Sequence, residues 1–314
     1  MTMKEIAKAL GLSVATVSRA INDKENVTPE TKKRVKEFTD KIMYTPNAAA
    51  QKLASNHEKT IGLLVPNFSN PFFSELVDEL CKKLYGKGYK VILYNSNNNW
   101  NLEREAIREM LSARVNGTVA ILTQSLYEEN PLMAFEGLNI PSILLDREMY
   151  FYKGAGIFLD NKAGSYEITK KLIEKGNRDI IFISGNLDLK TAKDRFEGYK
   201  EALREYEIPF KEENIFYGDF SLESGIEIGK KLLDKNIETI YAANNMMLMG
   251  ILRILKNMRK NIQLACFDKI SLLEILDYNI ISCEISLEEI SENVLEFIEK
   301  NSKEQLYLKP AVKG

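Results

Sequence analysis

The chain has 314 residues, of which 45% are hydrophobic and 28% are charged, and its formal net charge is −2. This length is sufficient for a small module plus one large two-lobed domain. No stretch has the length and apolarity of a membrane span, and the polar start lacks the apolar segment of a signal peptide. We therefore expect a cytoplasmic protein without a membrane partner.

The few cysteines and the single histidine exclude several classes of protein. Cys81, Cys266 and Cys283 are too scattered for a disulfide framework or a metal site, so we expect all three to be small buried hydrophobic residues. One histidine excludes a histidine-rich metal centre and most serine or cysteine catalytic triads.

The charge is distributed unevenly along the chain. Residues 1–57 contain ten Lys and Arg against six Asp and Glu, which gives +4 and leaves −6 for the remainder. Positive charge attracts nucleic-acid phosphates and makes binding salt-dependent. Lysine-rich helices are often only solvated surfaces, so the imbalance supports nucleic-acid binding without proving it.

The first 22 residues have the pattern of a helix-turn-helix. A capping box begins at Thr2, apolar residues follow at helical spacing, and Gly11 ends the first helix. Ser13 caps a second helix over residues 14–21. Two short helices around a glycine turn are typical of the element that lays its second helix in a DNA major groove, although an ordinary helical hairpin is the alternative.

A third helix and a short conditional one follow. Thr28-Pro29 predicts a helix start, and Val35, Phe38 and Ile42 can close a three-helix core. After Pro46, the run 47–55 has high helix propensity but is too short to be stable alone in water. We therefore expect a conditional helix here, which would act as a hinge.

From Lys59 onward the pattern changes to alternating strands and helices. Buried apolar runs bounded by polar or turn residues predict parallel strands, and the helical patterns between them predict open, doubly wound sheets. Ligands of such sheets bind at the carboxyl ends of the strands. The predicted strands are residues 60–65, 90–94, 117–122, 142–145, 180–183, 239–243 and 263–267.

Motifs of cofactor-dependent enzymes are incomplete. The run from Gly225 to Lys231 is one residue short of a phosphate loop, and Gly154-Ala155-Gly156 lacks the third glycine of a dinucleotide turn. We therefore expect no cofactor, no metal site and no catalytic residues. Paired carboxylates at glycosidase spacing remain open, since the chain offers many such pairs.

Seven strings in this order and spacing resemble LacI (lactose-repressor) family transcription regulators over essentially the whole chain. They are MKEIAKALGLSVATVSRAIN, VTPETKKRV, YTPNAAAQKLAS, KTIGLLVPNFSNPFFSEL, DRFEGY, GDFSLESG and AANNMMLMG. The resemblance implies a DNA-binding headpiece over 1–45, a hinge helix and linker over 46–58, and a core over 59–314. That core would have two lobes like a periplasmic sugar-binding protein, joined by crossovers near 160–161, 285–286 and 308–310.

The resemblance, together with the helix-turn-helix pattern, implies a set of DNA-contacting residues. Arg19 is the best candidate for a guanine contact, Thr16 and Ser18 would position phosphates, and Leu53 would act as an apolar wedge in the minor groove. The full set is Thr2, Val14, Ala15, Thr16, Ser18, Arg19, Asn22, Asn47, Ala50 and Leu53.

A second set, at strand ends and in two family motifs, would bind a small effector. Its carboxylates, amides and guanidinium pair with hydroxyls, and its aromatic rings cover the apolar side of a sugar. Alternatively, Asp146 and Arg147 pair only with each other, and Phe72 or Phe73 belongs to the core. The full set is Asn70, Phe72, Phe73, Asp146, Arg195, Phe220, Asn244 and Asp268.

Four further features bear on these expectations. Asn245 stands where the family usually has an aspartate, and no final strand is expected after Lys309-Pro310. The predicted helix 245–258 carries more methionine and leucine than one buried stripe requires, so part of it is expected at a dimer interface. Trp100 is expected at the start of a helix packed on the sheet rather than over a ligand.

The sequence thus predicts a homodimeric repressor of carbohydrate genes that binds pseudo-palindromic double-stranded operator DNA. Its DNA affinity would be altered by a sugar or sugar phosphate between the lobes. Two alternatives remain. In one, an effector or a protein partner strengthens DNA binding; in the other, the chain is a sugar-modifying enzyme with a DNA-binding head.

Overall fold

The computed structural model describes residues 1–42, 44, 59–127, 129–255, 262–270 and 279–314. The chain divides into two compact units, Met1–Glu58 and Lys59–Gly314. Within the described residues, none of the helices combines the length and the apolarity that crossing a membrane requires.

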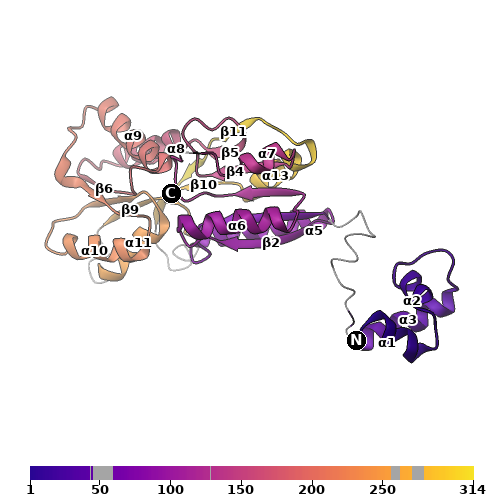
Figure 1. The fold of residues 1–314 in the computed structure, drawn as a ribbon. Helices are drawn as coiled ribbons and strands as arrows, with labels where there is room; N and C mark the ends of the chain where they lie inside the picture. Colours follow the sequence, from indigo (N-terminus) through magenta and orange to yellow (C-terminus); the bar gives the residue numbers. More distant parts are fainter. Residues whose placement is uncertain (43, 45–58, 128, 256–261, 271–278) are drawn as a thin grey trace. The chain divides into compact units, whose positions relative to one another are not determined.

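The first unit contains three helices, α1 (Met3–Leu10), α2 (Val14–Ile21) and α3 (Pro29–Lys41) (Figure 1). The predicted capping box is present at the start of α1, and Gly11 ends the helix with φ at 66°. Ser13 and Thr28 cap the other two helices. The three-helix core is confirmed, with buried side chains Ile6, Ala7, Val17 and Val35.

The second unit has two lobes, and lobe 1 is a parallel six-stranded sheet with helices on both faces (Figure 1). Its strands follow the order β11-β5-β4-β3-β1-β2. They are β1 (Thr60–Val65), β2 (Lys90–Asn95), β3 (Gly117–Ala120), β4 (Ser142–Asp146), β5 (Ala155–Leu159) and β11 (Gln305–Leu308).

Successive side chains of lobe 1 strands enter different cores. From β1, Ile61 and Leu63 join the cluster under α5 (Pro71–Gly86) and α13 (Leu287–Lys300). Leu64 instead joins the cluster under α6 (Trp100–Ser112) and α7 (Met133–Gly137). A strand buried on both faces has a continuous apolar sequence, which is why β1 was predictable.

Lobe 2 repeats this architecture with the strand order β12-β10-β9-β8-β6-β7. All its pairings are parallel except that of β12 with β10. The strands are β6 (Ile180–Ser184), β7 (Ile215–Tyr217), β8 (Thr239–Ala242), β9 (Gln263–Asp268), β10 (Ile280–Glu284) and β12 (Ala311–Lys313).

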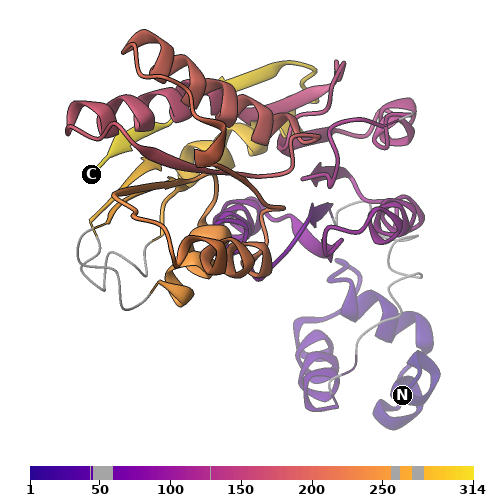
Figure 2. The same cartoon turned by 90° about the vertical axis from the view of Figure 1, so that its left-hand side faces the viewer.

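Two pairs of helices cover the lobe 2 sheet, one on each face (Figures 1 and 2). The first pair is α8 (Asn161–Glu174) and α9 (Lys190–Glu205), and the second is α10 (Leu222–Leu232) and α11 (Asn245–Ile254). A short 3₁₀ helix, η1 (Glu212–Asn214), precedes β7.

The predicted fold class is confirmed, as are all seven predicted strands, to within two residues at each end. Five strands were not predicted: β5, β7, β10, β11 and β12. The expectation that no final strand follows Lys309-Pro310 is wrong, because β12 pairs with β10 from Ala311 to Lys313.

Three crossovers connect the lobes where the sequence predicted them. The chain passes between the sheets from β5 to α8, from β10 to α13, and from β11 to β12. Residues of all three crossovers, including Leu159, Ile285 and Pro310, line one small cavity of about 450 Å³, so the crossovers lie side by side.

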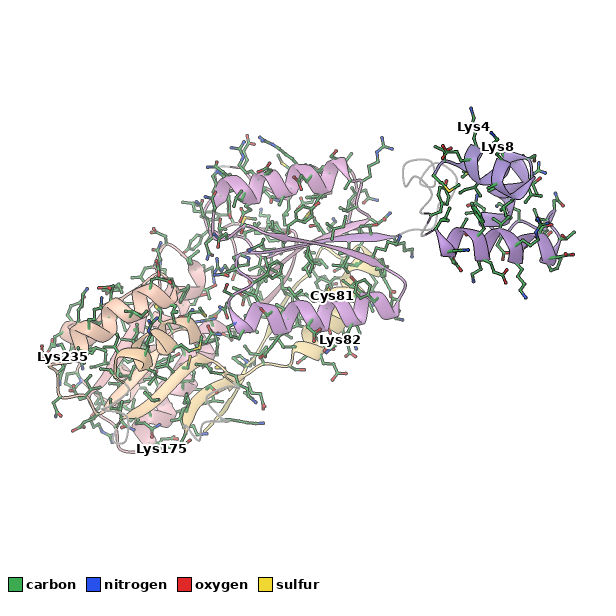
Figure 3. The ribbon with its side chains drawn as sticks, turned by 90° about the horizontal axis from the view of Figure 1, so that it is seen from below. Lys4, Lys8, Cys81, Lys82, Lys175 and Lys235 are labelled. Carbon is green, nitrogen blue, oxygen red and sulfur yellow. The ribbon has the colours of Figure 1, made fainter. Side chains whose placement is uncertain are left out.

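The cysteines follow the prediction with one correction. Cys266 and Cys283 are buried in the lobe 2 core, but Cys81 is only half-buried on α5, beside the exposed Lys82 (Figure 3). It lies at the margin of the contact between α5 and the sheet rather than inside it. Among the described residues, no cluster of histidines, cysteines and acids has the arrangement of a metal site.

Candidate DNA-contacting surface and interlobe cleft

Helix α2 presents an outer face that contains Val14, Ala15 and Arg19, all exposed. Val17 on the opposite face is fully buried and fixes the helix on the three-helix core. Helix α2 therefore has one face that packs on the core and one face that is exposed to solvent. The exposed face carries one cation and two small or apolar side chains, which suits close approach to base edges.

The hydroxyl and amide candidates make local hydrogen bonds. Thr16 Oγ1 lies 2.8 Å from the Oγ of Ser13, and Asn22 Nδ2 donates to the backbone oxygen of Ser18 at 2.8 Å. The side chain of Thr2 accepts from the backbone of Glu5. Thr2 and Asn22 thus cap helices α1 and α2, and Thr16 bonds to the cap residue Ser13, whereas Arg19 is an exposed donor on the same surface.

Lys4 and Lys8 extend from α1 into solvent (Figure 3), and they add positive charge to the same unit. Asn47, Ala50 and Leu53, together with the predicted hinge helix and His57, lie outside the described residues.

A cleft of about 360 Å³ lies between the two lobes at the carboxyl ends of their strands. All eight residues predicted to bind an effector line it. Lobe 1 contributes Asn70, Phe72, Phe73 and Asp146, and lobe 2 contributes Arg195, Phe220, Asn244 and Asp268. Other residues of the lining include Asn67, Asn98, Arg147, Thr191, Glu223 and Met246.

The lobe 2 wall centres on the buried guanidinium of Arg195. Its Nε donates to Asn161 Oδ1 at 2.8 Å, and its Nη1 donates to the backbone oxygen of Ala243. Nη1 also lies 3.6 Å from Asp268 Oδ1. Burial raises the pKa of Asp268 above its ordinary value, and the opposing effect of Arg195 is smaller. The other oxygen, Oδ2, accepts the backbone N–H of Asn245 at 3.1 Å.

The lobe 1 wall centres on Asp146, the last residue of β4, which has a left-handed φ of 62°. Its Oδ1 is buried and has no hydrogen-bond partner among the described residues. Burial raises the pKa of this carboxyl, against smaller opposing effects of Arg195 and Arg147. A buried acceptor without a donor is costly, so a ligand hydroxyl placed here would gain a strong hydrogen bond.

Arg147 does not pair with Asp146 in an ion pair, contrary to the alternative considered from sequence. Its Nη1 donates to Asn98 Oδ1 at 3.2 Å, and a weaker contact of 3.4 Å leads to the backbone oxygen of Leu122. The guanidinium carbon lies 5.7 Å from the centre of the Phe73 ring.

Aromatic rings form the apolar part of the cleft. Phe73 is buried in the lobe 1 core and also lines the cleft, so the two roles proposed for it coexist. Phe72 packs more loosely against the same core. Phe220 lies on the lobe 2 side with φ at 68°, and the amide of Asn244 donates to its backbone oxygen at 3.0 Å.

Direct contacts connect the lobes on either side of the cleft. Asn245 Nδ2 donates to Asn70 Oδ1 at 2.8 Å, while Asn245 Oδ1 is buried without a described partner. Farther along, Lys190 Nζ lies 3.0 Å from Glu148 Oε2, and the Lys190 backbone N–H donates to Ser125 Oγ at 2.9 Å.

Sequence reasoning missed several residues that support the site. Asn98, Asn161 and Asn245 hold the charged side chains or the lobes in place. Asn161 was named only as part of a crossover and Asn245 only as a departure from the family pattern. Asn245 could have been predicted from its position, because it directly follows Asn244 at a strand end.

Two expectations about other residues have different outcomes. Trp100 begins α6 and does not line the cleft, as expected. The apolar surplus expected on the helix after Asn244 is absent from its described part, residues 245–254. Met247 and Ile251 are fully buried, Met249 packs on the core and Met246 faces the cleft.

Comparisons with known proteins agree with this arrangement. Residues 2–47 match the family described as bacterial regulatory proteins, lacI family, and residues 58–271 match periplasmic binding proteins and sugar binding domain of LacI family. The HTH-type transcriptional repressor PurR of Proteus mirabilis is 34% identical over 257 residues, covering 79% of this chain and 74% of that protein.

Solved structures share the fold. The lac repressor dimer bound to operator and the anti-inducer ONPF matches with a TM-score of 0.80 at 20% identity, over 100% of this chain and 98% of that one. The Cra transcriptional dual regulator from Pseudomonas putida, in complex with fructose 1-phosphate, matches with a TM-score of 0.73 at 20% identity, over 82% and 98%.

A helix-turn-helix unit followed by a two-lobed ligand-binding core defines a DNA-binding transcription regulator with an effector-binding domain. The chain belongs to the LacI family of bacterial regulatory proteins. Its relatives are transcriptional repressors and not enzymes, and it is a repressor of that class.

Proposed function

We propose that this repressor changes its operator affinity when an uncharged sugar binds between the lobes. The observation that carries the proposal is the cleft itself, which gathers carboxylates, an amide, a guanidinium and aromatic rings within about 360 Å³. This combination suits a polyol with an apolar ring face. The proposed effector-binding residues are the eight named above.

Charge supports an uncharged ligand over a phosphorylated one. The lining contains the acids Asp146, Glu223 and Asp268 against the cations Arg147 and Arg195, and no lysine. Each guanidinium stands near a buried carboxylate whose field it already offsets. A phosphate group would add negative charge where acids already exceed bases.

A thermal-shift screen tests this proposal directly. Galactose, glucose, ribose, cellobiose and fructose 1-phosphate are each added to the full chain. An uncharged sugar at 100 times its Kd should stabilise the native state by about 2.7 kcal/mol, because it binds only that state. If only fructose 1-phosphate raises the melting temperature, the charge argument is wrong.

For DNA binding we propose the domain boundaries 1–45, 46–58 and 59–314 and the ten residues named above, with Arg19 on a base and Leu53 as a minor-groove wedge. Arg19 is exposed on α2 and has room to donate two hydrogen bonds to guanine. Action on operator DNA also supports a cytoplasmic location.

The test compares Arg19→Ala with Lys4→Ala on a duplex selected from a random pool. Arg19→Ala should lose about 1–3 kcal/mol on the selected duplex and little on random DNA. Lys4→Ala should weaken both equally, as a phosphate contact does. Equal losses for Arg19→Ala on both duplexes would contradict the base contact.

We further propose a homodimer that contacts its partner through β2 of lobe 1 rather than through the α11 methionines. Strand β2 is the edge of its sheet and exposes Ile92 and Leu93, the latter at 44%. Exposed apolar edge strands are normally covered. Leu93→Glu should therefore dissociate the full chain in sedimentation, whereas Leu138→Glu, also at an exposed leucine, should not. A dimeric Leu93→Glu protein would contradict this surface.

The opposite sign of switching remains a second candidate. The contact between Asn245 and Asn70 closes the cleft by an amide pair without a ligand. A ligand that strengthens closure would act as a co-repressor, and one that separates the pair would act as an inducer. Operator binding with and without the sugar found in the screen distinguishes the two.

A further inference from the structure

Lobe 1 contains a second cavity, of about 650 Å³, on the face of the sheet covered by α6 and α7. It shares no lining residue with the interlobe cleft. Its volume lies within the range of about 300–1,000 Å³ that small-molecule sites have. The lining includes Trp100, Arg104, Arg108, Tyr127, Asn130 and Met133.

One wall of this cavity is a fixed aromatic pair. The rings of Trp100 and Tyr127 lie 5.0 Å apart, centre to centre. Tyr127 donates its hydroxyl proton to Glu103 Oε1 at 2.9 Å, and its oxygen accepts the N–H of Gln124 at 2.9 Å. Glu103 is fully buried and also accepts the N–H of Thr123 at 2.7 Å. The loop after β3 is thus tied to α6, and the aromatic wall is preorganised.

The cavity is also lined by two positively charged side chains, Arg104 and Arg108. Arg104 and Arg108 lie one turn apart on α6, and both are exposed. Among the described residues neither forms an ion pair, although Arg104 lies 5.5 Å from the centre of the Trp100 ring. Like charges four residues apart on a helix repel each other, and an anion bound between them removes that repulsion.

The rest of the lining consists mainly of apolar and amide groups, together with one exposed carboxylate, Glu129. Ile107, Leu111 and Met133 offer apolar surface, and Met133 is 56% exposed. Gln124 and Asn130 offer both donors and acceptors. A planar ring with heteroatoms matches these groups, and a phosphate matches the two guanidinium groups.

We propose that this cavity binds an aromatic phosphate of nucleotide size. The ring lies against the aromatic wall and the apolar residues, and the phosphate lies between Arg104 and Arg108. The site is separate from the interlobe cleft and gives the repressor a second ligand of different chemistry. The proposal does not depend on the identity of the sugar.

Trp100 is the only tryptophan in the chain, so its fluorescence reports on this cavity. The full-length protein is titrated with adenosine 5′-monophosphate, with adenosine and inorganic phosphate as the two halves of the probe. We expect a saturable change with the monophosphate and binding at least about tenfold weaker with either half. Equilibrium dialysis measures the same affinities independently of fluorescence.

Three variants locate the binding. Arg108→Ala should weaken the monophosphate about tenfold or more, since it removes a charge-assisted contact. Lys87→Ala, an exposed cation at the end of α5, and Asp146→Asn, in the interlobe cleft, should bind it normally. Unchanged affinity in Arg108→Ala, or lost affinity in Asp146→Asn, would overturn the proposal. So would an absence of saturable binding in dialysis, or inorganic phosphate binding as tightly as the monophosphate.

Discussion

The two lobes share one strand order, yet they contribute to the cleft in opposite ways. In lobe 2, Arg195 and Asp268 are both buried, and each has partners within the protein. In lobe 1, Asp146 is equally buried, but its Oδ1 has no partner among the described residues. The lobe 2 carboxylate therefore has partners without a ligand, while the lobe 1 carboxylate retains an unused acceptor. Substitutions in the Arg195–Asp268 network should therefore affect folding as well as ligand binding, whereas substitution of Asp146 should affect mainly ligand binding.

The largest effect is expected from Arg195→Ala. Removing this guanidinium leaves Asp268 buried without its cation and Asn161 without its donor, so the free energy of unfolding should fall by about 3–5 kcal/mol. Urea denaturation measures this change. Arg204→Ala, at an exposed position on the same helix, should change it by less than about 0.5 kcal/mol. If Arg195→Ala lowers the free energy of unfolding no more than Arg204→Ala does, the Arg195 network does not stabilise the fold, and the proposed difference between the two walls is wrong.

A smaller change in the free energy of unfolding, of the opposite sign, is expected from Asp146→Asn. Burial raises the pKa of this carboxyl above 3.8, so its contribution to stability is present below that pH and is lost as the pH rises through the raised pKa. Above the raised pKa, the ionised group therefore opposes folding. Asparagine removes the charge and tolerates the left-handed φ, so the variant should be as stable as the unmodified protein, or more so.

Two measurements sharpen that prediction. As the pH rises through the raised pKa, the decline in stability caused by Asp146 should be absent from Asp146→Asn but unchanged in Asp188→Asn, an exposed aspartate. The stabilisation by the screened sugar should also be lost in Asp146→Asn alone. A variant that is strongly destabilised yet still responds to the sugar would show that Asp146 belongs to the folded framework.

The smallest effect is expected where the lobes meet at Lys190 and Glu148. Their side chains are 27% and 20% exposed, so water screens the pair only partly. A double-mutant cycle of Lys190→Met and Glu148→Gln should give a coupling energy of about 0.2–1 kcal/mol. A coupling near that of the Arg195 network would show that the interface, and not the lobe 2 wall, holds the cleft together.

Six of the seven strands predicted from sequence lie inside their sheets, the exception being the edge strand β2, while the interior strands β5 and β10 were missed. Strand β1 is buried on both faces, so every residue from Thr60 to Val65 had to tolerate burial. The other missed strands, β7, β11 and β12, lie at sheet edges, have three or four residues, and are only partly buried. Such short segments become strands because a neighbour pairs with them, and that information lies far away in the sequence.

The same reasoning explains the outcome at the cleft. Strand ends identify which residues line it, because the carboxyl ends of parallel strands meet at one edge. They do not identify which side chains already bond to one another. Nothing local to Asp146 distinguishes it from Asp268. The backbone N–H of Asn245 gives Asp268 a donor, whereas Asp146 Oδ1 has none among the described residues.

The three crossovers set the mechanics of any movement between the lobes. They lie side by side around one small cavity, and Gly164 packs so closely against Pro310 and Cys283 that no side chain fits there. Three crossover segments that lie side by side act as a hinge, which permits bending about one axis but resists twisting and sliding of the lobes. The lobes therefore have one soft degree of freedom, opening and closing at the cleft. A ligand in the cleft contacts both lobes, so a small change in the distance between the two cleft walls requires one lobe to rotate about the crossovers.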